Sequence, residues 1–251
     1  FMARFEPHKH SPHATDPNLW IAPMPETTIT SEALIRTLQD MPDTVGGFDQ
    51  WVRAELMALA KWYPALFDAL AALLELVEDT GVWAQSYVDG FISQIEKDAS
   101  ITEPGPLDLR PLSILSVLYR LWSKLRATEG LAWQETWMPD GVGRNATGCS
   151  IRAALDVADN VPGTLVVAGI SYDFKKAFDL VPFRLGLRVM FHRGFNRRML
   201  RALAGMYRQL RRRFKLPGGY LSSWVVVSNG ILQGCALSML MLNALVTCWV
   251  E

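Results

Sequence analysis

Cysteine is scarce in this sequence, and the few cysteines form no recognisable pattern. There are three, Cys149, Cys235 and Cys248, so they cannot all pair with one another, and their spacing matches no zinc motif. The sequence therefore indicates neither a disulfide framework nor a zinc site, and such usage suits a reducing compartment. We expect an intracellular protein, in the nucleus or the cytoplasm, without a disulfide partner.

A long apolar run is also missing. The most apolar stretch, Ala236 to Val250, is shorter than the roughly 20 residues that cross a bilayer, and it contains Ser238 and Asn243. The first residues, Phe1–Met2–Ala3–Arg4, have no apolar signal-peptide core. We therefore expect a protein that is not secreted and has no membrane partner. A membrane-associated helical protein that uses the terminal run is the alternative, and failure to partition into detergent would exclude it.

Acidic residues are absent between Leu180 and Val250, although the formal net charge of the whole chain is zero. Basic residues gather in the same region, from Arg184 to Lys215. Because no acid lies near them in the sequence, we predict that some contact the phosphate backbone of a nucleic acid, a solvated surface being the alternative. We predict a helix from Asn196 to about Leu210. The basic residues predicted to lie on one side of this helix and just beyond its end are Arg197, Arg201, Arg208 and Arg212.

The 251 residues are 50% hydrophobic, which allows a substantial core. Apolar residues recur at helical spacing from Gln50 to Glu78, and Pro64 divides this stretch into two helices. We predict the α/β class in its α+β form, with a helix-rich N-terminal half. Further predicted elements are a short helix from Thr30 or Ser31 through Leu38, a strand from Ile92 to Lys97, helices from Ser113 to Arg126 and from Pro182 to about Gly194, and a hairpin from Arg212 to Ser228.

The most informative stretch is an apolar run that leads to a carboxylate. Leu165 to Ile170 has the pattern of a buried strand, and Asp173 follows it closely. A strand of this kind delivers an acid to the rim of a sheet, where a cation can reach it, and Phe178 then lies in the following turn or helix start. Asp173 is therefore a candidate metal ligand. The alternative is that Asp173 caps a helix and that Phe178 belongs to the core.

Three separated motifs stand out along the chain. They are Arg110–Pro111–Leu112–Ser113, the pattern Asp-Phe-x-Lys-Ala-Phe-Asp from Asp173 to Asp179, and the pattern Gln-Gly-x-x-Leu-Ser from Gln233 to Ser238. Together, and in this order, they resemble the reverse transcriptase family, in the form carried by non-LTR retrotransposons. The resemblance runs from about Met41 to the chain end. It implies RNA-templated DNA synthesis, with an RNA template, a DNA primer and dNTPs as partners.

The resemblance also implies an architecture, namely the fingers and a partial palm of a right-hand polymerase, with the thumb absent. On this basis three parts are expected. They are residues 1–40, an N-terminal tail and short helix; residues 41–163, a fingers-like helical region; and residues 164–251, a partial palm with the central metal-binding strand and the basic helices.

The resemblance assigns roles to single residues. Asp173 would be catalytic and would bind Mg²⁺, with two ions in the complete enzyme and Mn²⁺ as a substitute. Phe174 would offer its carbonyl group, and Phe178 would lie under the ribose and exclude a 2′-hydroxyl group. Lys97 and Arg110 flank a loop and would bind the triphosphate, surface charges being the alternative. Gln233 and Gly234 would contact the nucleotide and template. Arg144, in a glycine-rich loop, would contact the template strand.

The sequence departs from the family pattern in two ways. Cys235 stands where the family usually has serine or another small residue. The aromatic-x-Asp-Asp motif, expected some tens of residues after Gly234, is absent. Tyr87–Val88–Asp89–Gly90 looks similar, but it has one acid and precedes the central strand, so we predict a helix end or turn there. One carboxylate cannot hold two metal ions, so we expect this chain to be an inactive fragment of its parent. A degenerate retroelement remnant that at most binds RNA is the alternative.

Overall fold

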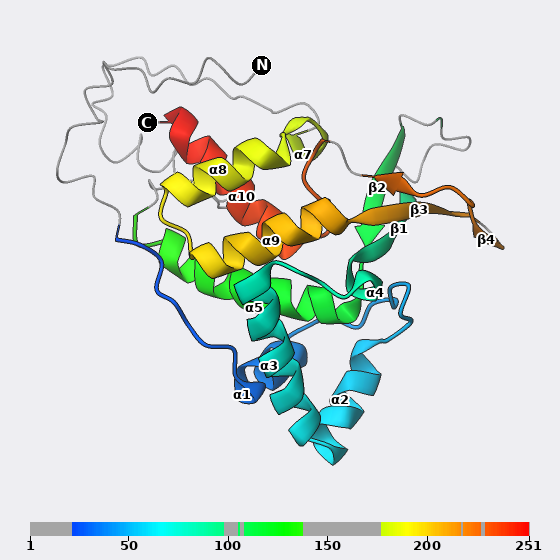
Figure 1. The fold of residues 1–251 in the computed structure, drawn as a ribbon. Coiled ribbons are helices and arrows are strands. Elements are labelled where there is room, and N and C mark those ends of the chain that lie inside the picture. The colour runs from blue at the N-terminus through cyan, green and yellow to red at the C-terminus, as the bar shows by residue number, and fades with distance from the viewer. Residues whose placement is uncertain are drawn as a thin grey trace, which may run out of the picture.

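The computed structural model describes residues 22–97, 105, 108–137, 177–216, 218–226 and 229–250 of the chain. Helices predominate in this part, and a small mixed sheet lies along one side of them (Figure 1). The predicted α+β class is therefore confirmed.

Three helices form the N-terminal part, as predicted. Helix α1 (Ser31–Gln39) begins where the hydroxyl group of Thr30 accepts a hydrogen bond from Ala33 N at 3.2 Å. Helices α2 (Arg53–Trp62) and α3 (Ala65–Thr80) are separated at Pro64, which has no N–H group to continue a helix. Helix α3 ends at Gly81, whose φ of 71° places it in the left-handed region that favours glycine.

Among the described residues the sheet has five strands. Helix α4 (Gln85–Val88) leads directly into β1 (Asp89–Glu96), which confirms the helix end predicted near Asp89. Strand β2 (Leu109–Ile114) pairs antiparallel with β1, and β3 (Arg211–Leu216) pairs parallel with β1 on the other side. The hairpin predicted from Arg212 to Ser228 is present, since β4 (Gly219–Tyr220) and β5 (Val225–Val226) both pair antiparallel with β3.

Strand β2 corrects one prediction. Ser113 was expected to begin a helix, but it lies in β2 opposite Ile92 of β1. Pro111 cannot donate a ladder hydrogen bond, and β2 accommodates it because β2 is an edge strand of the sheet. Helix α5 (Val117–Gln134) begins after Ser116, whose side chain accepts from Leu118 N at 3.1 Å.

The C-terminal helices are α7 (Ala177–Leu180), α8 (Phe183–His192), α9 (Arg197–Gln209) and α10 (Ala236–Val250), and α8 and α9 match the predicted ranges. They join the helical core through α10, which packs on α5, and through α9, which packs on α3. Leu237, Leu240, Met241 and Ala244 of α10 are fully buried, because α10 packs between α5 and α8. Among the described residues no single helix is long and apolar enough to cross a bilayer, while α2 and α3 together have the length and composition but are bent by 118°.

One hydrophobic core extends from Met24 to Ala244. It joins helices from both sides of the boundary expected at residues 163 and 164, since α3 packs on α9 and α5 packs on α10. That boundary itself lies outside the described residues.

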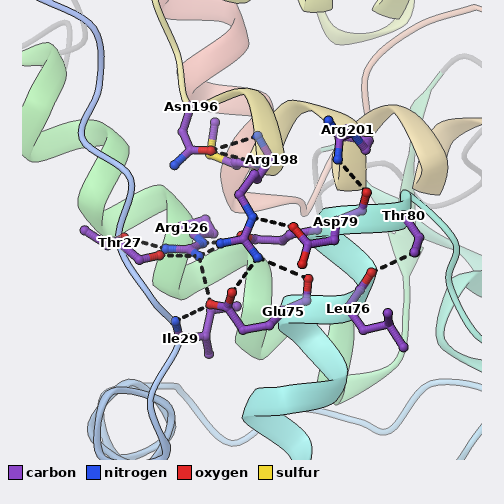
Figure 2. A network of polar contacts seen from close by, with 12 residues as sticks. Thr27, Ile29, Glu75, Leu76, Asp79, Thr80, Arg126, Asn196, Arg198 and Arg201 are labelled. Atoms are coloured by element: carbon purple, nitrogen blue, oxygen red, sulfur yellow. Dashed lines mark hydrogen bonds and ion pairs between the residues drawn. The ribbon is translucent and has the colours of Figure 1, made fainter.

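A polar network ties four segments of this core together (Figure 2). Arg126 of α5 is 1% exposed and donates to Glu78 of α3 through Nε at 2.7 Å and Nη2 at 2.8 Å. The same guanidinium group donates to the side chain and carbonyl oxygen of Thr27, in the extended N-terminal segment. Burial lowers the pKa of Arg126, but the hydrogen bonds and charge of Glu78 outweigh it, so the pKa lies above its usual value.

Candidate nucleotide and nucleic-acid sites

A cavity of about 330 Å³ lies between the sheet, α7 and the segment before α10. Its apolar lining comes from β1, β2, β3 and β5, from Phe178 of α7, and from Ile231 and Leu232. Four polar side chains also line it, and they are Asp179, Arg212, Asn229 and Gln233. The cavity is within the size range of small-molecule sites, which are mostly apolar with a few polar groups.

Two backbone hydrogen bonds bring three distant parts of the sequence together at this cavity. Ser113 N, at the free edge of β2, donates to the carbonyl oxygen of Gln233 at 3.2 Å. Ile231 N donates to the carbonyl oxygen of Phe178 at 2.7 Å. The side-chain amide of Gln233 then donates to Asp179 Oδ1 at 3.2 Å. Phe178 and Gln233, both predicted nucleotide contacts, therefore line the same cavity.

Position 234 requires glycine because this segment approaches β2 closely. Its φ of 101° is a conformation that residues with side chains rarely adopt. A Cβ atom at this position would lie 3.1 Å from Leu112 Cδ1 and 3.2 Å from the carbonyl oxygen of Ser113. The backbone of this segment therefore meets the backbone of β2, while the contact of Gly234 with the nucleotide and template stays a prediction.

Cys235 has a buried thiol next to the aromatic core. Its Sγ lies 3.1 Å from the hydroxyl oxygen of Tyr119. Burial raises the pKa of the thiol, and this keeps it protonated and unreactive near neutral pH. Cys235 and Cys248 are both free, and Cys149 lies outside the described residues.

Lys97 and Arg110 lie at the outer end of the β1–β2 hairpin. Lys97 N donates to the carbonyl oxygen of Asp108 at 2.8 Å, and Arg110 pairs with Ile95. Both side chains are exposed. Successive side chains of a strand point to opposite faces, so Arg110 lies on the face of β2 opposite to Pro111, which lines the cavity. The structure therefore brings the two predicted triphosphate contacts near each other but not into the cavity.

A second surface of interest lies on the other face of the sheet from the cavity. Alternation along β3 places Arg211, Arg213 and Lys215 together on this face. Arg211 and Arg213 lie over the ring of Trp224, with centroid distances of 4.6 and 4.0 Å. We call this surface the cation–aromatic face, and it consists of Arg211, Arg213, Lys215, Phe48, Phe91, Tyr220 and Trp224.

The rings of the cation–aromatic face form one connected group. Phe48 lies 5.0 Å from Tyr220, 5.5 Å from Trp224 and 6.0 Å from Phe91, measured between ring centroids. Lys215 lies 4.9 Å from the Phe91 centroid, and Tyr220 is 44% exposed. Aromatic rings with cations beside them are the usual elements of single-stranded nucleic-acid binding, because bases stack on rings and phosphates pair with cations.

The basic residues of α9 have different surroundings from those predicted. Arg201 donates to the carbonyl oxygen of Asp79 at 2.5 Å, and the neighbouring Arg198 forms ion pairs with Glu75 and Asp79. These partners are on α3, more than 100 positions earlier in the sequence. The lack of acids near these arginines in the sequence therefore did not mean that they lack acidic partners in the fold. Arg197 lies over the Phe191 ring at 5.2 Å, Arg208 is exposed, and Arg212 lies in β3 rather than beside the helix.

Arg212 points away from the cation–aromatic face and lines the cavity. Its Nη1 donates to Ser113 Oγ at 2.6 Å. Burial lowers the pKa of Arg212, and the nearby groups of Tyr207 and Asp179 oppose this shift. Arg211, in contrast, forms a two-pronged ion pair with Asp89, at 3.0 and 2.8 Å. Asp89 is thus engaged in the sheet, as expected for a residue outside the catalytic motif.

Several predicted residues cannot be placed. Asp173, Phe174 and Arg144 lie outside the described residues, as does the strand predicted before Asp173. Within the described ranges no group of three histidine, cysteine or acidic side chains is arranged to hold a metal ion. The sequence reasoning missed Asp179 and Trp224, and it missed the division of the β3 bases between two faces, because three consecutive arginines give no period-2 pattern.

Comparison of the sequence with protein-family models and with curated proteins finds no match.

Proposed function

We propose that this chain is the fingers and partial palm of an RNA-templated DNA polymerase, and that the cavity beside Phe178 forms part of its nucleotide site. The observation that carries this proposal is the convergence of three motifs on one cavity. Ser113, Phe178 and Gln233 are far apart in the sequence, yet hydrogen bonds join their segments.

Two groups at the cavity have a use in nucleotide binding, and Asp173 would add a metal ion. The Phe178 ring offers an apolar surface for a sugar, and the Gln233 amide carries both a donor and an acceptor. Asp173 would hold Mg²⁺ through carboxylate oxygens, which are the ligands this ion prefers. Nucleotidyl transfer uses two such ions, so the parent protein would need further carboxylates for activity.

A photo-cross-linking experiment tests the nucleotide site. The full chain is irradiated with 8-azido-dATP and Mg²⁺, and the labelled peptides are identified by mass spectrometry. We expect labels in Leu109–Ile114 or in residues 229–235, suppressed by excess dATP, because these segments border the cavity. Gln233→Leu should reduce labelling severalfold, whereas Gln39→Leu, at an exposed position of α1, should not. Labels confined to α2 and α3 would contradict the proposal.

A second candidate function is RNA binding by a degenerate element without synthesis. The cation–aromatic face favours it, because Arg213 and Lys215 suit phosphates and the 44% exposed Tyr220 suits a stacked base, although Phe91 is buried and Arg211 is already paired with Asp89. The same face also suits the template of an active polymerase, so it does not decide between the two. The two candidates differ in whether the parent protein extends a primer.

A further inference from the structure

Arg212 is the arginine of β3 that lines the cavity, and no described residue forms an ion pair with it, although the charge of Asp179 acts on it from the same cavity. Its neighbour Arg211 is paired with Asp89, and Arg198 is paired with Glu75 and Asp79. Arg212 instead donates to the neutral hydroxyl group of Ser113, and its buried Nε has no hydrogen-bond acceptor among the described residues. Asp179, the acid that lines the same cavity, accepts from Gln233.

A partly buried cation without an ion-pair partner is costly, and an anionic ligand removes that cost. The guanidinium group suits phosphate oxygens in particular, because it is planar, always charged and able to donate two parallel hydrogen bonds. The remaining lining includes the rings of Phe178 and Phe214, which suit the apolar surface of a sugar or a base.

We propose that Arg212 is the anion-recognising residue of this cavity, which holds a nucleotide with a phosphate at Arg212 and its sugar and base against Phe178 and Phe214. The identity of the ligand as a nucleotide rests on the proposed function. Arg212 thus has a role distinct from that of Arg211 and Arg213, which face the opposite side of the sheet.

The hydrogen bond to Ser113 fixes the position of this charge. Ser113 belongs to β2, and its backbone N–H also bonds Gln233. Arg212, Ser113 and Gln233 therefore form a continuous chain of contacts around the cavity. A ligand phosphate would meet a guanidinium group that is already oriented, which reduces the entropy lost on binding.

The test compares dATP with deoxyadenosine, which lacks the phosphates. Equilibrium binding of each to the full chain is measured through its tryptophan fluorescence, without metal, for the unaltered protein and for Arg212→Gln. We expect the unaltered chain to bind dATP at least tenfold more tightly than deoxyadenosine. Arg212→Gln should remove most of this preference, weakening dATP about tenfold while leaving deoxyadenosine unchanged, since a hydrogen bond to a charged group is typically worth that much.

Two further variants keep the result interpretable. Arg188→Gln removes an exposed charge from α8, away from the cavity, and should leave both affinities unchanged. Arg212→Lys keeps the charge and should restore part of the preference for dATP.

An equal loss of affinity for both ligands in Arg212→Gln, or no loss of affinity for either, would overturn the inference. If Arg212→Gln keeps its dATP affinity while Phe178→Ala loses it, the inference fails and the proposed function stands. If the unaltered chain binds neither ligand, both fail.

Discussion

Replacing Glu78 by glutamine is expected to lower the free energy of unfolding by about 2–3 kcal/mol. Glu78 is fully buried and accepts hydrogen bonds from Trp122 Nε1 at 2.8 Å and from two nitrogens of Arg126. The neutral amide would remove the only fully buried negative charge beside the guanidinium group of Arg126 among the described residues. The ion pair of Arg126 with the partly exposed Glu129, at 2.7 Å, would remain and would compensate for part of the loss. Urea unfolding monitored by circular dichroism measures the effect.

Asp68→Asn is the matched control for Glu78→Gln. Asp68 lies on the same helix, α3, but it is exposed in the first turn. Its loss removes only a favourable interaction with the helix dipole, so we expect a change below about 1 kcal/mol. Equal effects of the two substitutions would show that the Glu78–Arg126 pair does not hold the helices together.

Gly205→Ala is expected to destabilise the protein by about 2 kcal/mol or more. A Cβ atom at position 205 of α9 would lie 1.8 Å from the carbonyl oxygen of Gly81, at the end of α3. Overpacking of this kind costs roughly 1–3 kcal/mol and sometimes more, because the obstacle is backbone and cannot rotate away. The better helix propensity of alanine returns at most about 1 kcal/mol, so the clash prevails.

Thermal and urea unfolding of Gly205→Ala should be compared with those of Gly219→Ala. Gly219 lies in β4, and a Cβ atom there would meet nothing within 4 Å. We expect Gly219→Ala to change the stability by less than about 0.5 kcal/mol. An unchanged stability of Gly205→Ala would mean that α3 and α9 do not approach as closely as described.

The elements that the sequence predicted well are those whose signals are local. Helices α1, α2 and α3 follow from a capping threonine, from helical spacing of apolar residues, and from the proline and glycine that end them. The helix predicted from Ser113 begins too early, within the last two residues of β2, because the pairing of β2 with β1 is not local. The apolar residues after Arg110 fit either structure when considered alone, and only the register with β1 decides between them.

The candidate site was predicted in part, for a similar reason. The motifs identified Phe178, Gln233 and Gly234, which the structure gathers beside β2. The motifs could not show that Arg212 faces the cavity while Arg211 and Arg213 face the other side. The face on which each side chain lies depends on where β3 begins and how it lies in the sheet. Likewise, the acids that pair with Arg198 come from α3, so only the packing of α3 on α9 reveals them.

Primer extension on an RNA template with Mg²⁺ tests the central claim most directly. The assay compares this chain, the longest product of the reading frame that contains it, and the same product with Asp173→Ala. The account predicts DNA synthesis by the longest product and none after Asp173→Ala. A longest product that is inactive, yet binds RNA with an affinity that falls as salt rises, would contradict the polymerase proposal and favour the RNA-binding remnant.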